Sequence, residues 1–265
     1  MLSFAAICPH PPIIVPTIGS QEDLKKVSKT IKAMEKLAEI FAKVTPKTVI
    51  IISPHGPVDF NRFTVTNSPV LLGHFYNFGD FQTELIFKND TKLIELIKKE
   101  CLQKDIPLRT VELKELDHGV LVPLYYLAKK HPNFKVVPLA YSFLDLKTHF
   151  YFGKAIQSAI KKYSEKSVGI VASGDLSHCL TFEAPAGYNK RGKEFDEKLV
   201  KLLKNKDVEG VLNMSPDLVE EAGECGYRSI ITLLGALSNL DWQPKILSYE
   251  GPFGVGYTVA LLKIK

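Results

Sequence analysis

Thr48-Val49-Ile50-Ile51-Ile52-Ser53-Pro54-His55 is the stretch that decides the fold class. A short run of mostly β-branched residues that ends at a proline is typical of a strand buried on both faces, as in a parallel sheet. Leu2 to Cys8 is a similar run, and it ends at Pro9. Between the two runs, apolar residues from Leu24 to Phe41 recur at three- and four-residue spacing, which predicts an amphipathic helix of about 22 residues. The chain therefore begins with a predicted strand-helix-strand unit.

The same alternation continues along the chain. Further strands are expected at 63–66, 85–88, 108–113, 135–140 and 168–172, and helices at 91–103, 120–130, 147–163, 193–203 and 227–237. This order predicts an α/β fold with a mainly parallel central sheet and helices on both faces. Lys245 to Tyr249 and Tyr257 to Lys263 flank a turn-rich segment and suit a C-terminal antiparallel strand pair. We expect residues 1–265 to form a single domain.

Composition narrows the class of protein. The chain of 265 residues is 45% hydrophobic and 24% charged, which is enough for one large domain. Its net charge of +5 is spread without an arginine block, so nucleic-acid binding gains little support. The four cysteines lack CxxC spacing, which fits a reduced, cytoplasmic setting. The long apolar run of a membrane span is missing, and Met1 to Gly19 has no basic leader, so we expect neither membrane association nor a removed signal.

Three histidines follow predicted strands. They are His10 in Cys8-Pro9-His10-Pro11-Pro12, His55 in Ser53-Pro54-His55-Gly56-Pro57, and His178 in Ser173-Gly174-Asp175-Leu176-Ser177-His178. Ligand-binding residues of an open α/β sheet gather outside the carboxyl ends of its strands, so these histidines can meet although they are far apart in sequence. Each one alone is equally typical of a hydrogen-bonded loop histidine. Together they predict a metal or acid/base site.

The third metal ligand is expected to be an anion. Two imidazoles and a carboxylate form a facial triad that holds Fe(II) and leaves positions open for substrate and dioxygen. Glu224, just before a predicted apolar helix, is the first candidate, and its alternative role is to complement the helix macrodipole. Cys225 is the rival ligand, because a thiolate would favour zinc or copper.

Other residues are candidates for proton transfer or for the substrate pocket. His178 could move protons, with Asp175 orienting its ring. His118, between Asp117 and Gly119, is a second pocket histidine, although Asp117 could simply cap the following helix. The segment from Gly73 to Gly79 is expected to be a loop that walls a pocket. Aromatic side chains offered as apolar walls for a flat ring, with plain packing as the alternative, are Phe75, Tyr76, Phe78 and Phe253.

Five short motifs in this order resemble the class III extradiol (LigB-type) dioxygenase superfamily, with the Memo and AmmeMemoRadiSam group as the most similar branch. The motifs begin at Cys8, Ser53, Asp117, Ser173 and Glu224. The resemblance extends from His10 to Gly256. It implies a single α/β domain, a small aromatic substrate with O2, and, in the dioxygenases, a non-haem Fe(II) held by two histidines and a glutamate. A homo-oligomer is compatible with it.

Carried over residue by residue, the resemblance implies that His10 and His55 are metal ligands and that His178 is the acid/base residue. It makes His118 a neighbour of the oxygen site. The family's glutamate falls on Cys225, beside Glu224, and the Memo branch is similar to this chain in having Cys-Gly there. The resemblance thus leaves two functions open. One is an Fe(II)-dependent extradiol dioxygenase, and the other is a Memo-like protein that binds copper or zinc, or a partner protein, without cleaving rings.

Overall fold

The structure, a computed structural model, describes residues 1–164 and 167–265. Its strands are β1 (Leu2–Cys8), β2 (Thr48–Ser53), β3 (Phe63–Thr66), β4 (Val70–Phe75), β5 (Asp80–Asn89), β6 (Leu108–Val111), β7 (Lys135–Ala140), β8 (Val168–Ser173), β9 (Trp242–Glu250) and β10 (Tyr257–Ile264). Its α-helices are α1 (Gln21–Lys26), α2 (Ser28–Val44), α3 (Thr91–Gln103), α4 (His118–Lys130), α5 (Leu146–Lys162), α6 (Lys190–Lys204), α7 (Val208–Leu212), α8 (Pro216–Ala222) and α9 (Tyr227–Ala236).

The strands join one ten-stranded sheet. Its main path runs β4-β5-β7-β2-β8-β1-β10-β9, and β3 and β6 branch from β7. The centre is parallel, because β2 pairs with both β7 and β8, and β8 pairs in turn with β1. The two ends of the path are antiparallel pairs, β4 with β5 and β9 with β10. The predicted α/β class, with a mostly parallel sheet and a C-terminal antiparallel pair, is confirmed.

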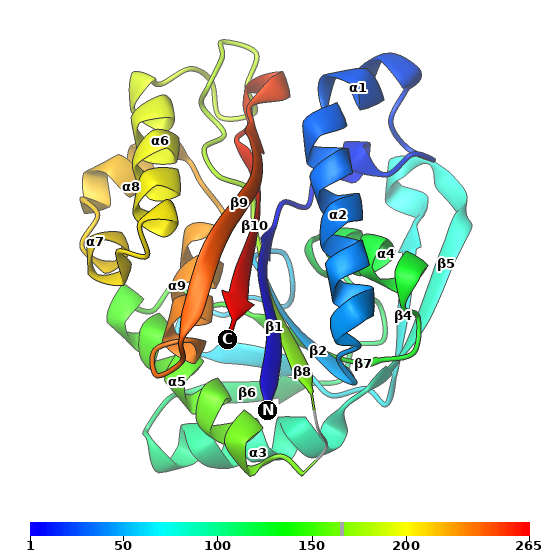
Figure 1. The fold of residues 1–265 in the computed structure, drawn as a ribbon, viewed down its shortest axis with the longest axis vertical. Helices are drawn as coiled ribbons and strands as arrows, with labels where there is room; N and C mark the ends of the chain where they lie inside the picture. The colour runs from blue at the N-terminus through cyan, green and yellow to red at the C-terminus, as the bar shows by residue number, and fades with distance from the viewer. Residues whose placement is uncertain (165–166) are drawn as a thin grey trace.

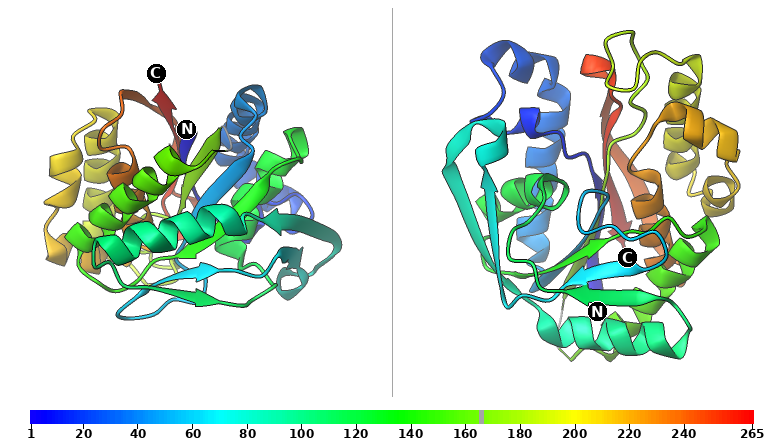
Figure 2. Two further views of the ribbon diagram at one scale, coloured as in Figure 1. Left: turned by 90° about the horizontal axis from the view of Figure 1, so that it is seen from below. Right: turned by 180° about the vertical axis from the view of Figure 1, so that it is seen from behind.

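Helices cover both faces of the sheet (Figures 1 and 2). Successive side chains of a strand point to opposite faces, so β2 supplies Ile50 and Ile52 to one core and Val49 and Ile51 to the other. The first core also contains residues of α3, α5 and α9, and the second contains residues of α2 and α4. A central strand without a polar face is therefore explained by helices on both sides.

Two local predictions were wrong. The single helix expected around Leu24 to Phe41 is divided into α1 and α2 by Val27, whose backbone leaves helical geometry at φ −100° and ψ 18°. The expected loop from Gly73 to Gly79 instead contains the end of β4 and a 3-10 turn (Tyr76–Phe78) before β5. Gly73 lies within β4. Helix α4 passes close to it, so a Cβ atom there would meet the Leu121 side chain at 2.3 Å.

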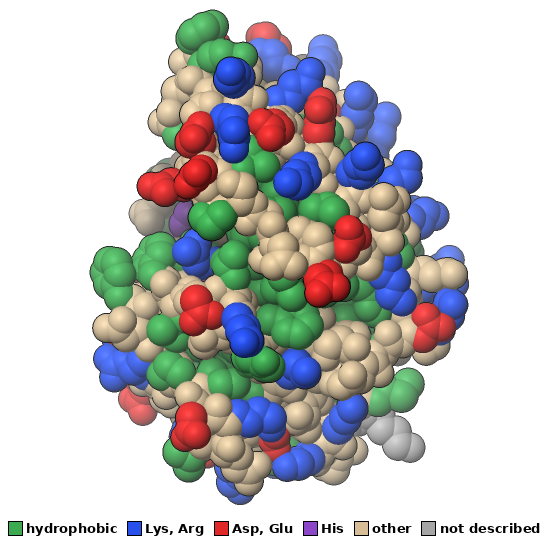
Figure 3. Space-filling view, turned by 90° about the vertical axis from the view of Figure 1, so that its left-hand side faces the viewer, with side chains coloured by type: hydrophobic (Ala, Val, Ile, Leu, Met, Phe, Trp, Pro, Cys, Tyr) green, Lys and Arg blue, Asp and Glu red, His purple; other side chains and the backbone are tan. Residues whose placement is uncertain are grey.

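Two further features bear on partners. Among the described residues, none of the helices combines the length and the apolar character that crossing a membrane requires. On the face shown in Figure 3, Lys and Arg side chains are interspersed with Asp and Glu side chains. This face therefore does not concentrate charge of one sign.

Candidate metal centre

Three adjacent parallel strands, β2, β8 and β1, end at the same edge of the sheet. His55 lies two residues beyond β2, His10 two residues beyond β1, and His178 five residues beyond β8. The register of β1 against β8 pairs Cys8 with Ser173, so the two segments leave the sheet side by side. The topology therefore places all three histidines beyond the carboxyl ends of neighbouring strands.

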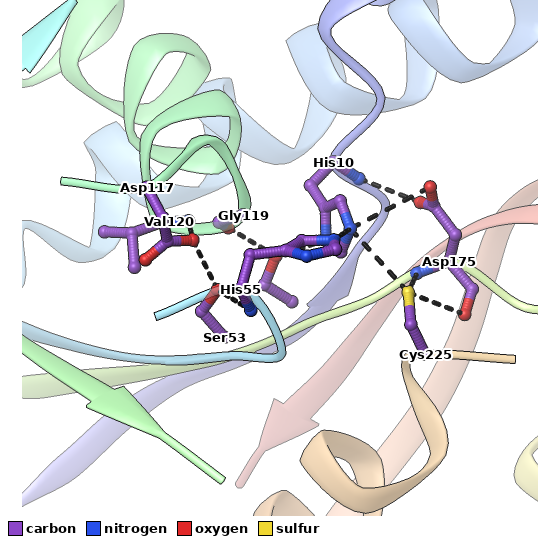
Figure 4. A network of polar contacts seen from close by, with 9 residues as sticks. His10, Ser53, His55, Asp117, Gly119, Val120, Asp175 and Cys225 are labelled. Carbon is purple, nitrogen blue, oxygen red and sulfur yellow. Dashed lines mark hydrogen bonds and ion pairs between the residues drawn. The ribbon is translucent and has the colours of Figure 1, made fainter. Parts of the chain in front are cut away.

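His10, His55 and His118 meet at this edge, and Figure 4 shows the rings of the first two next to each other. One potential ligand atom from each lies within 4.8 Å of the others. The Nε2 atoms of His10 and His55 are 3.0 Å apart, and the His55 ring stacks on the His118 ring with centroids 4.3 Å apart. His118 was predicted to lie outside the ligand set, whereas the structure brings it into the histidine group.

The histidine group suits a first-row metal ion. Nitrogen ligands lie about 2.0–2.1 Å from zinc, so two nitrogens 3.0 Å apart can share one ion without moving. Burial, reinforced by the neighbouring histidines, holds the pKa of His10 well below its usual range. Burial likewise lowers the pKa of His55 to about 4. Both rings are thus neutral near pH 7, which is the form that binds metals.

Cys225 and Glu224 are adjacent in sequence but face different partners. The Cys225 Sγ lies 3.7 Å from His10 Nε2 and accepts a hydrogen bond from the backbone N–H of Asp175 at 3.3 Å. The Glu224 carboxylate instead accepts a hydrogen bond from the backbone N–H of Tyr227 at 2.5 Å, in the first turn of α9. Of the two candidate ligands, the thiol is the one that lies against the histidines.

The backbone of this segment is fixed by two glycines. A Cβ atom on Gly174 would lie 2.0 Å from the Cα atom of Gly226, so the segment after β8 touches the start of α9. The N–H of Gly226 also donates to the Asp175 carbonyl at 2.9 Å. A side chain at either glycine would therefore meet backbone atoms of the other segment, so the segment that carries Cys225 would have to shift.

Asp175 binds to His10 rather than orienting His178 in the way the sequence suggested. Its Oδ1 accepts from the His10 backbone N–H at 3.0 Å, and its Oδ2 lies 3.9 Å from His10 Nε2. Burial raises the pKa of Asp175 to about 7, while burial lowers that of His10. The close pair is therefore not a stable ion pair near neutral pH, and Asp175 is a further polar group facing His10 Nε2.

His178 lies close enough to the group to lower the pKa of both His10 and His55. Its backbone N–H donates to the Ala222 carbonyl at 3.1 Å, and its own carbonyl accepts from the Ala186 N–H at 3.2 Å. Its Nδ1 atom is buried and has no hydrogen-bond partner among the described residues. Burial also lowers the pKa of its ring. His178 is thus held in place by its backbone, and burial of its ring favours the neutral form.

The start of α4 is attached to the end of β2. Asp117 caps the helix by accepting from the Val120 N–H at 3.1 Å, and it also accepts from Ser53 Oγ at 2.6 Å. Ser53 Oγ in turn accepts from the His55 backbone N–H at 3.1 Å. The capping role that the sequence offered as an alternative is therefore present, and it positions His118 and His55 relative to each other.

The four aromatic side chains expected to wall a pocket take different positions. Phe78 makes an edge contact with His118, with ring centroids 5.4 Å apart. Phe75 is fully buried in the core against Tyr125, which corrects its assignment as a wall. Tyr76 stacks on His74. Phe253 lies at the turn between β9 and β10, with the Lys26 ammonium 5.7 Å from its ring centroid.

A cavity of about 300 Å³ adjoins His55. Its size is at the lower end of the range for small-molecule sites. It is lined by His55, Gly56, Pro57, Thr66, Asn77, Leu113, Glu115, Leu116, Asp117, Val120, Pro138, Leu139 and Ala140. A wider cleft of about 670 Å³ near Lys47 and Lys135 lies at the other edge of the sheet, away from the histidines. The smaller cavity is therefore the one that matters for chemistry at the histidine group.

Comparison with known proteins identifies the family. The model of the family described as the catalytic LigB subunit of aromatic ring-opening dioxygenase matches residues 4–260. Protein CA_C1420 of Clostridium acetobutylicum is 37% identical over 97% of this chain. A 4,5-DOPA dioxygenase extradiol-like protein of Schizosaccharomyces pombe is 26% identical over 62% of this chain. The matched regions cover only 56% of each of these two relatives.

A solved structure shares the fold. The crystal structure of the uncharacterized protein JW3007 from Escherichia coli K12 superposes with a TM-score of 0.62 at 19% sequence identity. The match covers 98% of this chain and 99% of that one. At this level of identity the likeness establishes the architecture alone.

Proposed function

The chain belongs to the family of the catalytic LigB subunit of aromatic ring-opening dioxygenases, and from this premise we propose that it is a non-haem Fe(II)-dependent extradiol dioxygenase acting on a catechol-like aromatic diol. The observation that carries the proposal is the convergence of His10, His55 and His118 beside a cavity of about 300 Å³. A shared fold does not fix function, so the argument rests on these side chains.

His10 and His55 would hold the metal, with His118, Cys225 or Asp175 completing the ligand set. Bound Fe(II) would supply open positions for a chelating diol and for dioxygen. The cavity beside His55 would hold the ring, and Phe78 packs against His118 of the same histidine group. The residues of the chain thus bind and orient the substrate at the edge of the sheet.

His178 would act as the acid/base residue. A neutral imidazole can accept a proton from a substrate hydroxyl and later return it, and burial favours the neutral form of the His178 ring. Its backbone hydrogen bonds to Ala222 and Ala186 hold the ring in place. Replacing a general acid/base lowers the rate by about 10²–10⁴-fold.

The test uses protein loaded anaerobically with Fe(II) and mixed with a panel of catechols. We expect oxygen consumption and yellow ring-opened products from wild type. His178→Ala should retain iron and lose about 10²–10⁴-fold in kcat. His131→Gln, at the far end of α4, is the matched control and should keep full activity. Iron-loaded wild type that consumes no oxygen with any catechol would contradict the proposal.

A second function is favoured by the position of Cys225. A thiol 3.7 Å from His10 Nε2, where the dioxygenases are expected to have a carboxylate, suits a copper or zinc site without ring cleavage. Metal content of the purified protein separates the two. Copper or zinc lost in Cys225→Ser but kept in Glu224→Gln supports this second function, whereas iron that survives Cys225→Ser supports the dioxygenase.

A further inference from the structure

We infer that Ser173 is a positioning residue that holds the proton of His10 on Nδ1 and thereby leaves Nε2 free to bind a metal ion. The inference rests on the proposed metal site, since it assigns a role toward that site. Ser173 is the last residue of β8 and is fully buried. Its hydroxyl faces Nδ1 of the His10 ring, whereas the proposed metal site faces Nε2.

The hydroxyl of Ser173 has two neighbours. Its Oγ lies 2.5 Å from the Gly119 carbonyl oxygen and 3.0 Å from His10 Nδ1. A carbonyl oxygen can only accept a hydrogen bond, and serine has a single hydroxyl proton. That proton is therefore donated to Gly119, and a lone pair of Oγ faces His10. For this contact to be a hydrogen bond, His10 Nδ1 must carry a proton.

A neutral imidazole carries one ring proton, so Nε2 of His10 is then an acceptor. Burial favours this neutral form by lowering the pKa of His10. The free lone pair faces His55 Nε2 at 3.0 Å, Cys225 Sγ at 3.7 Å and Asp175 Oδ2 at 3.9 Å. In the metal-free protein, His55 consequently donates the 3.0 Å hydrogen bond. A metal ion bound by the Nε2 atoms of His10 and His55 therefore has to replace only one proton, the one on Nε2 of His55.

The Gly119 carbonyl is itself held in place. Gly119 lies in the first turn of α4, whose cap is Asp117. A Cβ atom on Gly119 would meet Ser53 Oγ at 2.4 Å and Asp117 Oδ1 at 2.9 Å, so a side chain would displace the carbonyl. The carbonyl that orders Ser173 is thus fixed by the same contacts that join α4 to β2.

Two measurements test the assignment. In metal-free wild type labelled with ¹⁵N-histidine, long-range proton-nitrogen spectra should show His10 with a protonated Nδ1 and an unprotonated Nε2. The His10 signals are identified by their absence in His10→Asn. In Ser173→Ala this single form should give way to a mixture. The Zn²⁺ affinity of Ser173→Ala, from competition with a chromogenic chelator, should fall by about 10–100-fold, as when outer partners of metal-binding histidines are removed.

Ser177→Ala is the matched control. Ser177 is also buried near the end of β8, and its Oγ donates to the Ala222 carbonyl at 2.9 Å and accepts from the Cys179 N–H at 3.0 Å. These two hydrogen bonds involve backbone groups, whereas the Ser173 hydroxyl faces a histidine ring. Replacement of Ser177 should leave the His10 spectrum and the Zn²⁺ affinity within about three-fold of wild type.

A protonated Nε2 on His10 in metal-free wild type would overturn the inference, and so would Zn²⁺ affinity in Ser173→Ala within about three-fold of wild type. If Ser173→Ala fails to fold, the wild-type spectrum alone decides. The outcome is separable from that of the proposed reaction. Absence of ring cleavage together with the expected Ser173 results would reject the dioxygenase and keep Ser173 as a positioning residue.

Discussion

The central parallel strands begin at one side of the sheet, here called the amino edge, and end at the other, the carboxyl edge. Polar side chains are buried in opposite ways at these two edges. At the amino edge, Asp90 accepts hydrogen bonds from Thr48 Oγ1 and Tyr163 OH, both at 2.5 Å, and from the Leu93 N–H at 3.2 Å. At the carboxyl edge, His178 Nδ1 is buried without a partner among the described residues. The first arrangement satisfies a buried carboxylate, and the second leaves a buried polar atom unsatisfied.

The charge state of the buried groups also differs between the two edges. Although burial opposes it, hydrogen bonds from Lys104 and Lys162 hold the pKa of the buried Glu100 below its usual range, so this carboxylate stays charged. At the carboxyl edge, burial shifts the pKa of His10 downward and that of Asp175 upward to about 7, which favours the neutral forms. Paired charges are typical of structural networks, whereas clustered groups driven toward neutrality are typical of binding sites. The amino edge should therefore control stability and the carboxyl edge should control ligand binding.

The strongest test of this contrast is Asp90→Ala. It removes the acceptor of Thr48, Tyr163 and the Leu93 N–H, and buried hydrogen bonds to a charged group contribute about 1.5–3 kcal/mol each before relaxation. We expect the free energy of unfolding in urea to fall by about 3 kcal/mol. Zn²⁺ affinity should stay unchanged.

Glu95→Ala is the control for Asp90→Ala, because Glu95 is exposed on α3 and pairs with the exposed Lys98. It should change the free energy of unfolding by less than about 0.5 kcal/mol. A large loss of Zn²⁺ affinity in Asp90→Ala would contradict the claim that the amino edge controls stability and not ligand binding.

The next test is His10→Ala, which removes a proposed ligand from the carboxyl edge. Zn²⁺ affinity should fall by more than about 100-fold, beyond the range caused by loss of an outer partner. Saturating Zn²⁺ should raise the melting temperature of wild type and of Asp90→Ala by mass action. It should have no such effect on His10→Ala, while His131→Gln should respond like wild type. Equal Zn²⁺ stabilisation of wild type and His10→Ala would remove His10 from the metal site.

Features that depend on strand order could be predicted from the sequence. Apolar runs ended by prolines located β1 and β2, and parallel strands share a carboxyl edge, which is enough to bring His10 and His55 together. The segment containing β4 was missed because Gly73 interrupts its alternation. The need for a glycine there comes from α4, a contact that no local pattern encodes.

Side-chain direction could not be predicted in the same way. Glu224 and Cys225 are neighbours, yet it is Cys225 that lies against His10, in a segment whose position depends on the close approach of Gly174 to Gly226. His118 was predicted as a pocket histidine beside the oxygen site and not as a member of the ligand set, because the sequence does not position its helix start against β2. Ser173 and Ser53 both stand at strand ends, yet neither was predicted to contribute, because a serine after a strand has no distinctive spacing of its own.

The smallest expected effect concerns Glu224. Its side chain is buried near the carboxyl ends of the strands, and burial favours its neutral form. Burial raises its pKa to about 7 from an ordinary value of 4.5. Between these two pH values the folded state binds the proton more tightly than the unfolded state, so the stability of wild type declines as pH rises from about 4.5 to 7. Glu224→Gln keeps an acceptor for the Tyr227 N–H and has no proton to lose. The variant should therefore match wild type at pH 5 and exceed it at pH 8 by about 1–2 kcal/mol in urea unfolding.

The exposed Glu220, on the preceding α8, provides the comparison for Glu224→Gln. Glu220→Gln should follow the wild-type curve at both pH values, because the side chain is exposed and surface substitutions of this kind change stability little. A gap between Glu224→Gln and wild type that is as large at pH 5 as at pH 8 would mean that the glutamate contributes through packing or its hydrogen bond. In that case the preference of this edge for neutral side chains would be confined to the groups that face His10.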